Sequence, residues 1–252
     1  MTIDYPDEAQ YPALRQLWQQ AFGDTDAFLD GFFATGFSPK RCRCLSWNER
    51  CAAALYWFDC RWGEKKLAYV YAVATQEDFR GKGFCRMLME DTHKLLKEQG
   101  YHGAILVPGS RQLFDLYEKL GYRGCCPMEQ QAVVAQDAPV TVRALTAEEF
   151  AQLRRQRLPE NAVVQEGDSL SYLATFAGFY EAQESVFCAS LDGDNLLFQE
   201  FLGQENMLPG ILTALGAKQG VTPRPGGTQN RAMYYPLTED ETLPGYFGLP
   251  LN

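Results

Sequence analysis

Hydrophobic residues in the first third of the chain follow a helical period and then a strand period. Leu14, Trp18 and Phe22 recur at helical spacing, and Gly23 ends the pattern. Three later runs, rich in aromatic and small apolar residues, are bounded by polar turns and predict strands. The predicted elements are a strand over residues 2–5, helices over 11–22 and 24–35, and strands over 41–47, 51–62 and 67–75. The order is therefore β-α-α-β-β-β.

A glycine-rich turn joins the last of these strands to an amphipathic helix predicted over residues 82–99. Gly81 and Gly83 allow close approach of a ligand and φ values that other residues avoid. The first amides of a helix lack intrahelical partners and carry partial positive charge, so they bind phosphate. The cationic side chains around this terminus are Arg80, Lys82 and Arg86. We therefore interpret the turn as a pyrophosphate-binding site.

Two common phosphate-binding motifs do not fit this turn. A P-loop requires Ser or Thr after its lysine, whereas Lys82 is followed by Gly83. A dinucleotide fold requires a third glycine, and Arg86 occupies that position. These differences argue against a nucleotide triphosphatase and against a dinucleotide-dependent enzyme.

The turn resembles motif A of the Gcn5-related N-acetyltransferase (GNAT) family, Arg/Gln-x-x-Gly-x-Gly/Ala. Arg80, Gly83 and Cys85 lie on the motif positions, with Cys85 in place of a small residue. At the family's spacing, a predicted strand over 103–107 precedes a segment over 113–122 that resembles the family's closing helix. The two motifs occur in the family's order.

The resemblance implies a mixed-sheet α/β GNAT fold that uses acetyl-CoA as co-substrate. The phrase Val73-Ala74-Thr75 is most similar to the enhanced-intracellular-survival acetyltransferases, which carry a second, cofactor-free domain of the same fold. We therefore expect an N-terminal cofactor-binding domain followed by a degenerate GNAT-like second domain.

The resemblance also implies roles for individual residues. A backbone N–H in the segment 73–75 would polarise the thioester carbonyl, and Tyr117 would be the general acid. The cofactor-binding residues expected are Val73, Ala74, Thr75, Arg80, Gly81, Lys82, Gly83, Phe84, Cys85 and Arg86. The general base stays open between Asp59, a chain of waters and the terminal carboxylate of Asn252. His93 and His102 are expected to be structural or exposed.

A polar segment over residues 136–139 interrupts the periodicity, so we predict domains over 1–136 and 137–252. The second half is predicted to contain a strand over 141–143, a capped helix over 146–158, strands over 185–191 and 196–202, a helix over 206–215 and a loop over 223–227. The turn over 203–206 has one glycine, no arginine and an added carboxylate, so we expect it not to hold a pyrophosphate. We interpret this half as a degenerate copy that shapes the substrate cleft.

The net charge of −9 is uneven along the chain, because residues 1–136 hold 16 Lys and Arg against 17 Asp and Glu, and the remainder holds 7 against 15. Nucleic-acid binding normally needs a basic face and is not expected. The acidic second half either attracts a cationic amine or only maintains solubility.

The eight cysteines form no C-x-x-C pair and the chain has two histidines, so we expect free thiols and no metal. No apolar run is long enough to span a membrane and the N-terminus does not resemble a signal peptide. A cytoplasmic protein without membrane partners is expected. The leading hypothesis is an acetyl-CoA-dependent N-acetyltransferase acting on a primary amine of a small molecule or peptide. The alternatives are a non-catalytic acyl-CoA-binding or regulatory module and a transferase of longer acyl groups; the oligomeric state stays open.

Overall fold

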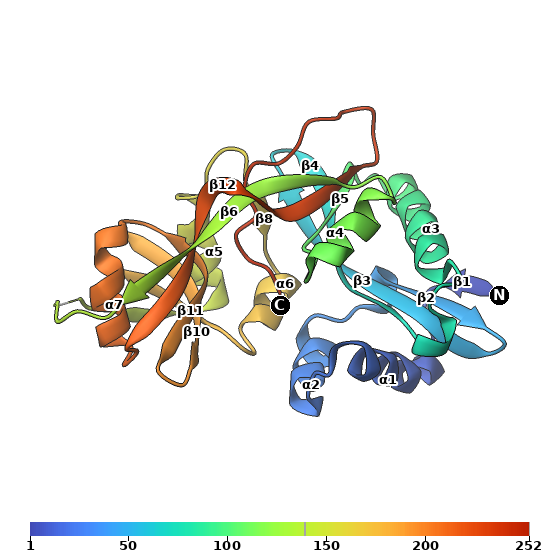
Figure 1. The fold of residues 1–252 in the computed structure, drawn as a ribbon, viewed down its shortest axis with the longest axis horizontal. Helices are drawn as coiled ribbons and strands as arrows, with labels where there is room; N and C mark the ends of the chain where they lie inside the picture. Colours follow the sequence, from blue (N-terminus) through green and yellow to red (C-terminus); the bar gives the residue numbers. More distant parts are fainter. Residues whose placement is uncertain (139, 252) are drawn as a thin grey trace. The chain divides into compact units, whose positions relative to one another are not determined.

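The computed structural model describes residues 1–138 and 140–251, which form two compact units of the chain (Figure 1). Unit 1 contains Met1–Arg123 and Met233–Thr242. Unit 2 contains Gly124–Ala232 and the residues from Leu243 onward. Both units are therefore discontinuous along the chain, and the domain boundary predicted after residue 136 falls inside unit 2.

Unit 1 is a mixed sheet with strand order β1-β2-β3-β4-β5-β12, in which β4 and β5 are parallel and the other neighbours are antiparallel. Its strands are β1 (Thr2–Asp4), β2 (Cys42–Trp47), β3 (Arg50–Trp62), β4 (Lys65–Thr75), β5 (Gly103–Leu106) and the last residues of β12 (Gln219–Pro236). Its helices are α1 (Tyr11–Phe22), α2 (Asp26–Thr35), α3 (Phe84–Glu98) and α4 (Arg111–Glu118), with 3-10 turns η1 (Glu8–Gln10), η2 (Pro39–Arg41) and η3 (Glu77–Phe79).

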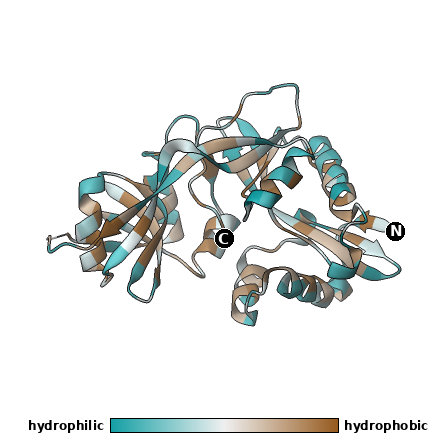
Figure 2. Cartoon of the chain, in the orientation of Figure 1, coloured by the Kyte–Doolittle hydropathy of each residue, from teal (hydrophilic) through white to brown (hydrophobic). Residues whose placement is uncertain are grey.

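Helices cover both faces of this sheet. On the α1–α2 face, the Trp18 ring lies 5.3 Å from that of Tyr56, and Phe32 lies 5.1 Å from Tyr56. On the opposite face, Trp57 and residues of α3 belong to one buried cluster, because successive strand residues point to opposite faces. Figure 2 shows that α3 carries both hydrophilic and hydrophobic residues, as expected for a helix with one buried side.

The predicted β-α-α-β-β-β order of unit 1 is confirmed, and the helix boundaries have local causes. Gly23 ends α1 in the left-handed conformation with φ of 74°. Thr25 caps α2 by accepting a hydrogen bond from the Phe28 backbone N–H at 3.3 Å.

Unit 2 also contains a mixed sheet. Its strand order is β12-β11-β10-β9-β7, in which β11 and β12 are parallel and β6 pairs with β12. Its strands are β6 (Arg123–Val134), β7 (Arg143–Leu145), β8 (Val163–Gln165), β9 (Gly178–Ala182), β10 (Ser185–Asp192), β11 (Asn195–Leu202) and most of β12. Its helices are α5 (Ala147–Arg155), α6 (Asp168–Leu173) and α7 (Leu208–Ala214), with the 3-10 turn η4 (Glu205–Met207). No helix among the described residues is long and apolar enough to cross a membrane.

Two expectations for unit 2 have different outcomes. The capping box is confirmed: Glu149 N–H donates to Thr146 Oγ1 at 3.2 Å, and the Glu149 carboxylate accepts from the Thr146 N–H at 2.8 Å. The loop predicted over residues 223–227 is wrong, because this segment lies within β12. Its prolines are tolerated there because they interrupt only part of a long strand.

Candidate functional site

The end of β4 is released from its parallel neighbour. Pairing of β4 with β5 ends at Tyr69 and Ile105. The register between β3 and β4 then shifts between Ala54 and Tyr56, and Ala72 adopts a positive φ of 48°. The bulge turns the strand away from β5, so backbone groups of the segment 73–75 on that side lack a strand partner. A ligand carbonyl could accept a hydrogen bond there.

The chain that follows β4 presents free amides. Gly81 and Gly83 have φ of 73° and 81°, which L side chains rarely adopt. Gly83 is the N-cap of α3, no side chain caps the helix, and the first cap bond runs from Met87 N–H to Gly83 O at 3.0 Å. The amides of Phe84, Cys85 and Arg86 therefore have no intrahelical acceptor.

The space above the two glycines is open. A Cβ built on Gly83 would meet only Met87 Cε, at 4.0 Å, and one built on Gly81 would meet nothing within 4 Å. The glycines are thus required by their backbone conformation, and the volume over them is available to a ligand. The predicted pyrophosphate-binding residues are brought together in one turn.

Cationic side chains surround this turn and hold its shape. Arg80 Nε donates to the Thr75 carbonyl at 3.3 Å, and Lys82 Nζ donates to the Asp78 carbonyl at 2.8 Å. Both cations bond to neutral carbonyls, so their charge is not cancelled by these contacts. Arg86 lies further along the helix. The result is positive charge next to free helix amides, the arrangement that binds phosphate.

Arg86 connects the start of α3 to the end of α4. Its Nη2 donates to the Lys119 carbonyl at 3.2 Å, and its Nη1 lies 3.5 Å from the Glu90 carboxylate. Both side chains of the Arg86–Glu90 pair are exposed, so that pair contributes little stability. The bond to Lys119 ties the helix that holds Tyr117 to the glycine turn.

Tyr117 on α4 is buried, with 6% of its surface exposed. Burial raises the pKa of its phenol well above the usual value, and the neighbouring Cys85 thiol raises it further. No described residue forms a hydrogen bond with its hydroxyl, while its ring packs edge-on against Tyr122 at 5.6 Å. Tyr117 is thus a protonated donor beside the first turn of α3, and its role as general acid remains a prediction.

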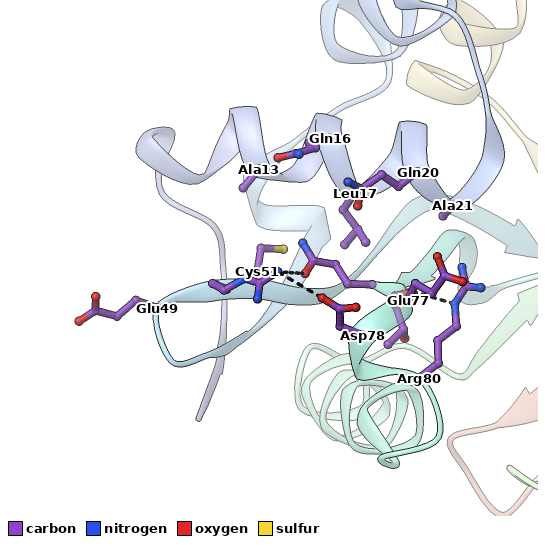
Figure 3. A pocket seen from close by; sticks show the side chains of 13 residues that line it. Ala13, Gln16, Leu17, Gln20, Ala21, Glu49, Cys51, Glu77, Asp78 and Arg80 are labelled. Atoms are coloured by element: carbon purple, nitrogen blue, oxygen red, sulfur yellow. Dashed lines mark hydrogen bonds and ion pairs between the residues drawn. The ribbon is translucent and has the colours of Figure 1, made fainter.

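A cavity of about 570 Å³ opens beside the same turn (Figure 3). It is lined by α1, the β2–β3 turn and the segment from Thr75 to Arg80. Its charged lining residues are Glu49, Arg50, Glu77, Asp78 and Arg80. The sequence analysis did not identify the α1 wall, Gln16 and Gln20 included, because nothing in the local pattern links this helix to the glycine turn.

Asp59, one of the candidates for the general base, lies far along the sheet from the segment 73–75. Asp59 pairs with Ala68, six residues before Ala74 on β4, which places it about 20 Å along the strand from the segment 73–75. Asp59 is instead engaged by Tyr101 and by Arg41, whose Nη1 lies 3.4 Å away. Asn252 lies outside the described residues.

The two histidines match their structural interpretation. His93 is buried, its Nε2 lies 2.8 Å from Tyr122 Oη, and its ring stacks on Tyr235 at 4.0 Å. His102 directly precedes β5, and its backbone N–H donates to the Lys66 carbonyl at 2.8 Å. Neither imidazole lines the described cavity beside the glycine turn.

Comparisons with known proteins agree with this geometry. A family profile described as an acetyltransferase (GNAT) domain matches residues 2–125. A Gcn5-related N-acetyltransferase from Anabaena variabilis is similar in structure, with a TM-score of 0.73, 15% identity, and coverage of 94% of this chain and 73% of that one. A comparison with curated proteins found no match.

Two further solved structures share the fold across both units. Eis1 from Mycobacterium abscessus has a TM-score of 0.68 and 9% identity, and the match covers 94% of this chain and 74% of that one. A tandem GNAT protein from the clavulanic acid biosynthesis pathway has a TM-score of 0.57 and 9% identity over 95% and 99% of the two chains. Residues 2–125, which hold the glycine turn and the bulged strand β4, therefore match the acetyltransferase (GNAT) domain family.

Proposed function

We propose that this protein is an acetyl-CoA-dependent N-acetyltransferase that acts on a primary amine. The observation that carries the proposal is the uncapped start of α3, set behind two positive-φ glycines and directly after the bulged end of β4. This arrangement supports binding of a diphosphate at the turn and of a thioester beside the strand.

The residues present fit the diphosphate of CoA. The amides of Phe84, Cys85 and Arg86 would hold its oxygens, because they lack other acceptors and sit at the positive end of the helix dipole. Arg80 and Lys82 would balance its charge. When bound, the cofactor supplies an activated acetyl group as a thioester.

The chain's own groups would then serve the transfer. An unpaired N–H in the segment 73–75 would donate to the thioester carbonyl and stabilise negative charge on its oxygen. Tyr117 would donate its proton to the departing sulfur, since its phenol is protonated at neutral pH. Removal of the proton from the attacking amine is left to solvent.

Charge favours a cationic acceptor. Three carboxylates, those of Glu49, Glu77 and Asp78, line the cavity beside Thr75, against two guanidinium groups. The second half of the chain is also acidic, with 7 Lys and Arg against 15 Asp and Glu beyond residue 136. An ammonium-bearing substrate would be attracted to this surface before it loses a proton.

The experiment is a thiol-release assay with acetyl-CoA and a panel of amines that contains polyamines, amino sugars and peptides with free N-termini. The expected result is release that depends on both acetyl-CoA and an amine. Calorimetric binding of CoA without release by any amine would instead support a non-catalytic acyl-CoA-binding module. Absence of CoA binding would reject both proposals.

A further inference from the structure

Unit 2 contains a cavity of its own, of about 380 Å³. It is lined by residues at the end of β11, by the turn Gly203 to Glu205 that follows, by the start of α7, and by the segment of β12 from Thr222 to Pro225. Arg157 and Glu184 complete its wall. All of these residues belong to unit 2.

The cavity exists because two parallel strands separate at this point. Pairing of β11 with β12 ends at Leu197 and Val221, and Thr222 is the next residue along β12. The register between β10 and β11 shifts just beyond, so that Phe198 and Glu200 face consecutive residues of β10. The strands thus part in the same way as β4 and β5 of unit 1.

Thr222 lines this cavity and holds a buried polar atom without a partner. Thr222 is 1% exposed, and its Oγ1 has no hydrogen-bond partner among the described residues. A buried hydroxyl without a partner costs on the order of 1–3 kcal/mol. A ligand atom that bonds to this hydroxyl would remove that cost.

Arg157 supplies a positioned cation at the same cavity. Its Nε donates to the Glu184 carbonyl at 2.7 Å and its Nη1 donates to the Leu153 carbonyl at 3.0 Å. Both partners are neutral, and no carboxylate of the described residues forms an ion pair with Arg157. The guanidinium is therefore held in place while its charge, and its Nη2 donors, stay available to an anion.

Two carboxylates and a second guanidinium also line the cavity. Arg224 Nε lies 2.8 Å from the Glu205 carboxylate, so this pair is neutral as a whole. Glu184 Oε2 accepts a hydrogen bond from the neutral Gln204 Nε2 at 3.5 Å, so its negative charge stays in the cavity wall. The remaining wall is apolar and consists of Phe201, Leu202, Leu208, Pro223 and Pro225.

We propose that this cavity binds a small carboxylate with an apolar body. The carboxylate would accept from Arg157 Nη2 and Thr222 Oγ1, and the body would lie against the apolar wall. Charge-assisted bonds of this kind are stronger than neutral ones. The cavity volume suits a small molecule rather than a nucleotide.

CoA is not the ligand that this cavity fits. A Cβ placed on Gly203 would lie 2.1 Å from Ser185 Oγ, so the volume above this glycine is filled, unlike that above Gly83. The helix that follows, α7, is short and begins with Leu208-Pro209, which offers few free amides. A diphosphate has no equivalent place here.

The test uses the full chain and 3-phenylpropionate, hexanoate and benzoate as probes in titration calorimetry, with 3-phenylpropanol as the uncharged comparison. Wild type is expected to bind at least one carboxylate, and the alcohol about tenfold more weakly. Thr222→Val and Arg157→Gln should each weaken binding about tenfold. Arg155→Gln, an exposed neighbour paired with Glu166 outside the cavity, should bind like wild type.

Stability separates a ligand-binding role of Thr222 from a structural one. Without probe, Thr222→Val should melt at or above the wild-type temperature, because the substitution removes a buried hydroxyl that lacks a partner. A lower melting temperature, or equal probe affinity in wild type and both cavity variants, would overturn the proposal, as would failure of all three carboxylates to bind.

A final control distinguishes this site from the glycine turn of unit 1. Probe affinity should be unchanged in Gly83→Glu and in the presence of saturating CoA. Competition by CoA would place the probe in unit 1 and reject the unit 2 site. Loss of acetyl transfer with intact probe binding would concern only the proposed function.

Discussion

The two units share one plan and differ at one turn. In each, a bulged strand leads through a 3-10 turn into a helix and then into a parallel strand, β4-η3-α3-β5 in unit 1 and β11-η4-α7-β12 in unit 2. In each, the parallel pairing spans three residue pairs before the strands part. The two units therefore share the point at which the parallel strands part.

The residues at this point decide what each unit can bind. In unit 1 the glycines leave open space in front of the uncapped 15-residue helix α3. In unit 2 the volume above Gly203 is taken by Ser185, and α7 has 7 residues. A few turn residues thus separate the proposed diphosphate site of unit 1 from a smaller cavity with one positioned arginine in unit 2.

Gly83→Glu is the strongest test of this difference. A Glu side chain would enter the open space over the turn and add negative charge next to the expected diphosphate, so acetyl-CoA binding should be lost. Calorimetry should give one CoA per wild-type chain and none per variant chain. If unit 2 held a second CoA site, the variant would retain half of the wild-type stoichiometry.

The matched control is Gly193→Glu in the β10–β11 turn. Gly193 also has a positive φ, 58°, and open space around it, so the backbone strain is comparable. This variant should bind acetyl-CoA like wild type. Equal loss of binding in both variants would mean that strain, not occupation of the turn, abolishes binding.

Tyr117→Phe should lower kcat by about 10²–10⁴-fold if its hydroxyl protonates the departing sulfur. The corresponding barrier change is about 3–5 kcal/mol. Acetyl-CoA affinity should hardly change, since the ring stays in place. The measurement is kcat with an amine for which chemistry limits turnover.

Tyr122→Phe provides the comparison, because Tyr122 is an equally buried tyrosine whose hydroxyl already bonds to His93. It should lose stability, by about 1 kcal/mol, and keep kcat within about twofold. A kcat for Tyr117→Phe within about twofold of wild type would leave solvent as the proton source.

The core of unit 2 contains a buried ion pair between Arg154 and Glu200. Arg154 and Glu200 are 1% and 0% exposed in their side chains, and Arg154 Nε lies 2.5 Å from Glu200 Oε2. Tyr246 Oη donates to Glu200 Oε1 at 2.9 Å. Arg154→Met should lower the free energy of unfolding by about 3–5 kcal/mol, because Glu200 is left buried and unpaired.

Chemical denaturation of the full chain measures this loss. Addition of Glu200→Gln to Arg154→Met should recover part of it, since no unpaired charge then remains buried. Arg155→Met, whose side chain is 55% exposed, should change stability little. A double variant less stable than Arg154→Met would show that the pair is not the cause.

Local signals were enough to predict much of unit 1. The helix that ends at Gly23 and the strand that leads into Gly81 are set by spacing and turn chemistry, which the sequence displays directly. The glycine turn could be recognised because its residues are contiguous. The α1 wall of the cavity and the cavity of unit 2 could not, because they join segments that are distant in sequence, such as Arg157 and Thr222.

The boundary between the units could not be predicted from the sequence for a similar reason. The polar segment around residue 136 looks like a linker, but β12 supplies Met233–Pro236 as the antiparallel neighbour of β5 in unit 1. Such pairing depends on long-range register rather than on local propensity. The same long strand contains the prolines that suggested a loop over residues 223–227.

The smallest expected effect concerns pH and unit 1, which contains both histidines of the chain. Burial lowers the pKa of His93 to about 4 from its ordinary value near 6.5. The folded state therefore disfavours the proton that the unfolded state binds. The stabilisation is full above pH ~6.5 and is lost as pH falls toward ~4, and the loss reaches about 2 kcal/mol by pH ~5.

The measurement is the free energy of unfolding between neutral pH and pH ~5, with His93→Gln as the comparison. The wild type should lose stability over this interval, and the variant should lose about 2 kcal/mol less, because glutamine can still bond to Tyr122 but does not titrate. Parallel curves for the two proteins would show that His93 takes up its proton as readily in the folded state as in the unfolded one.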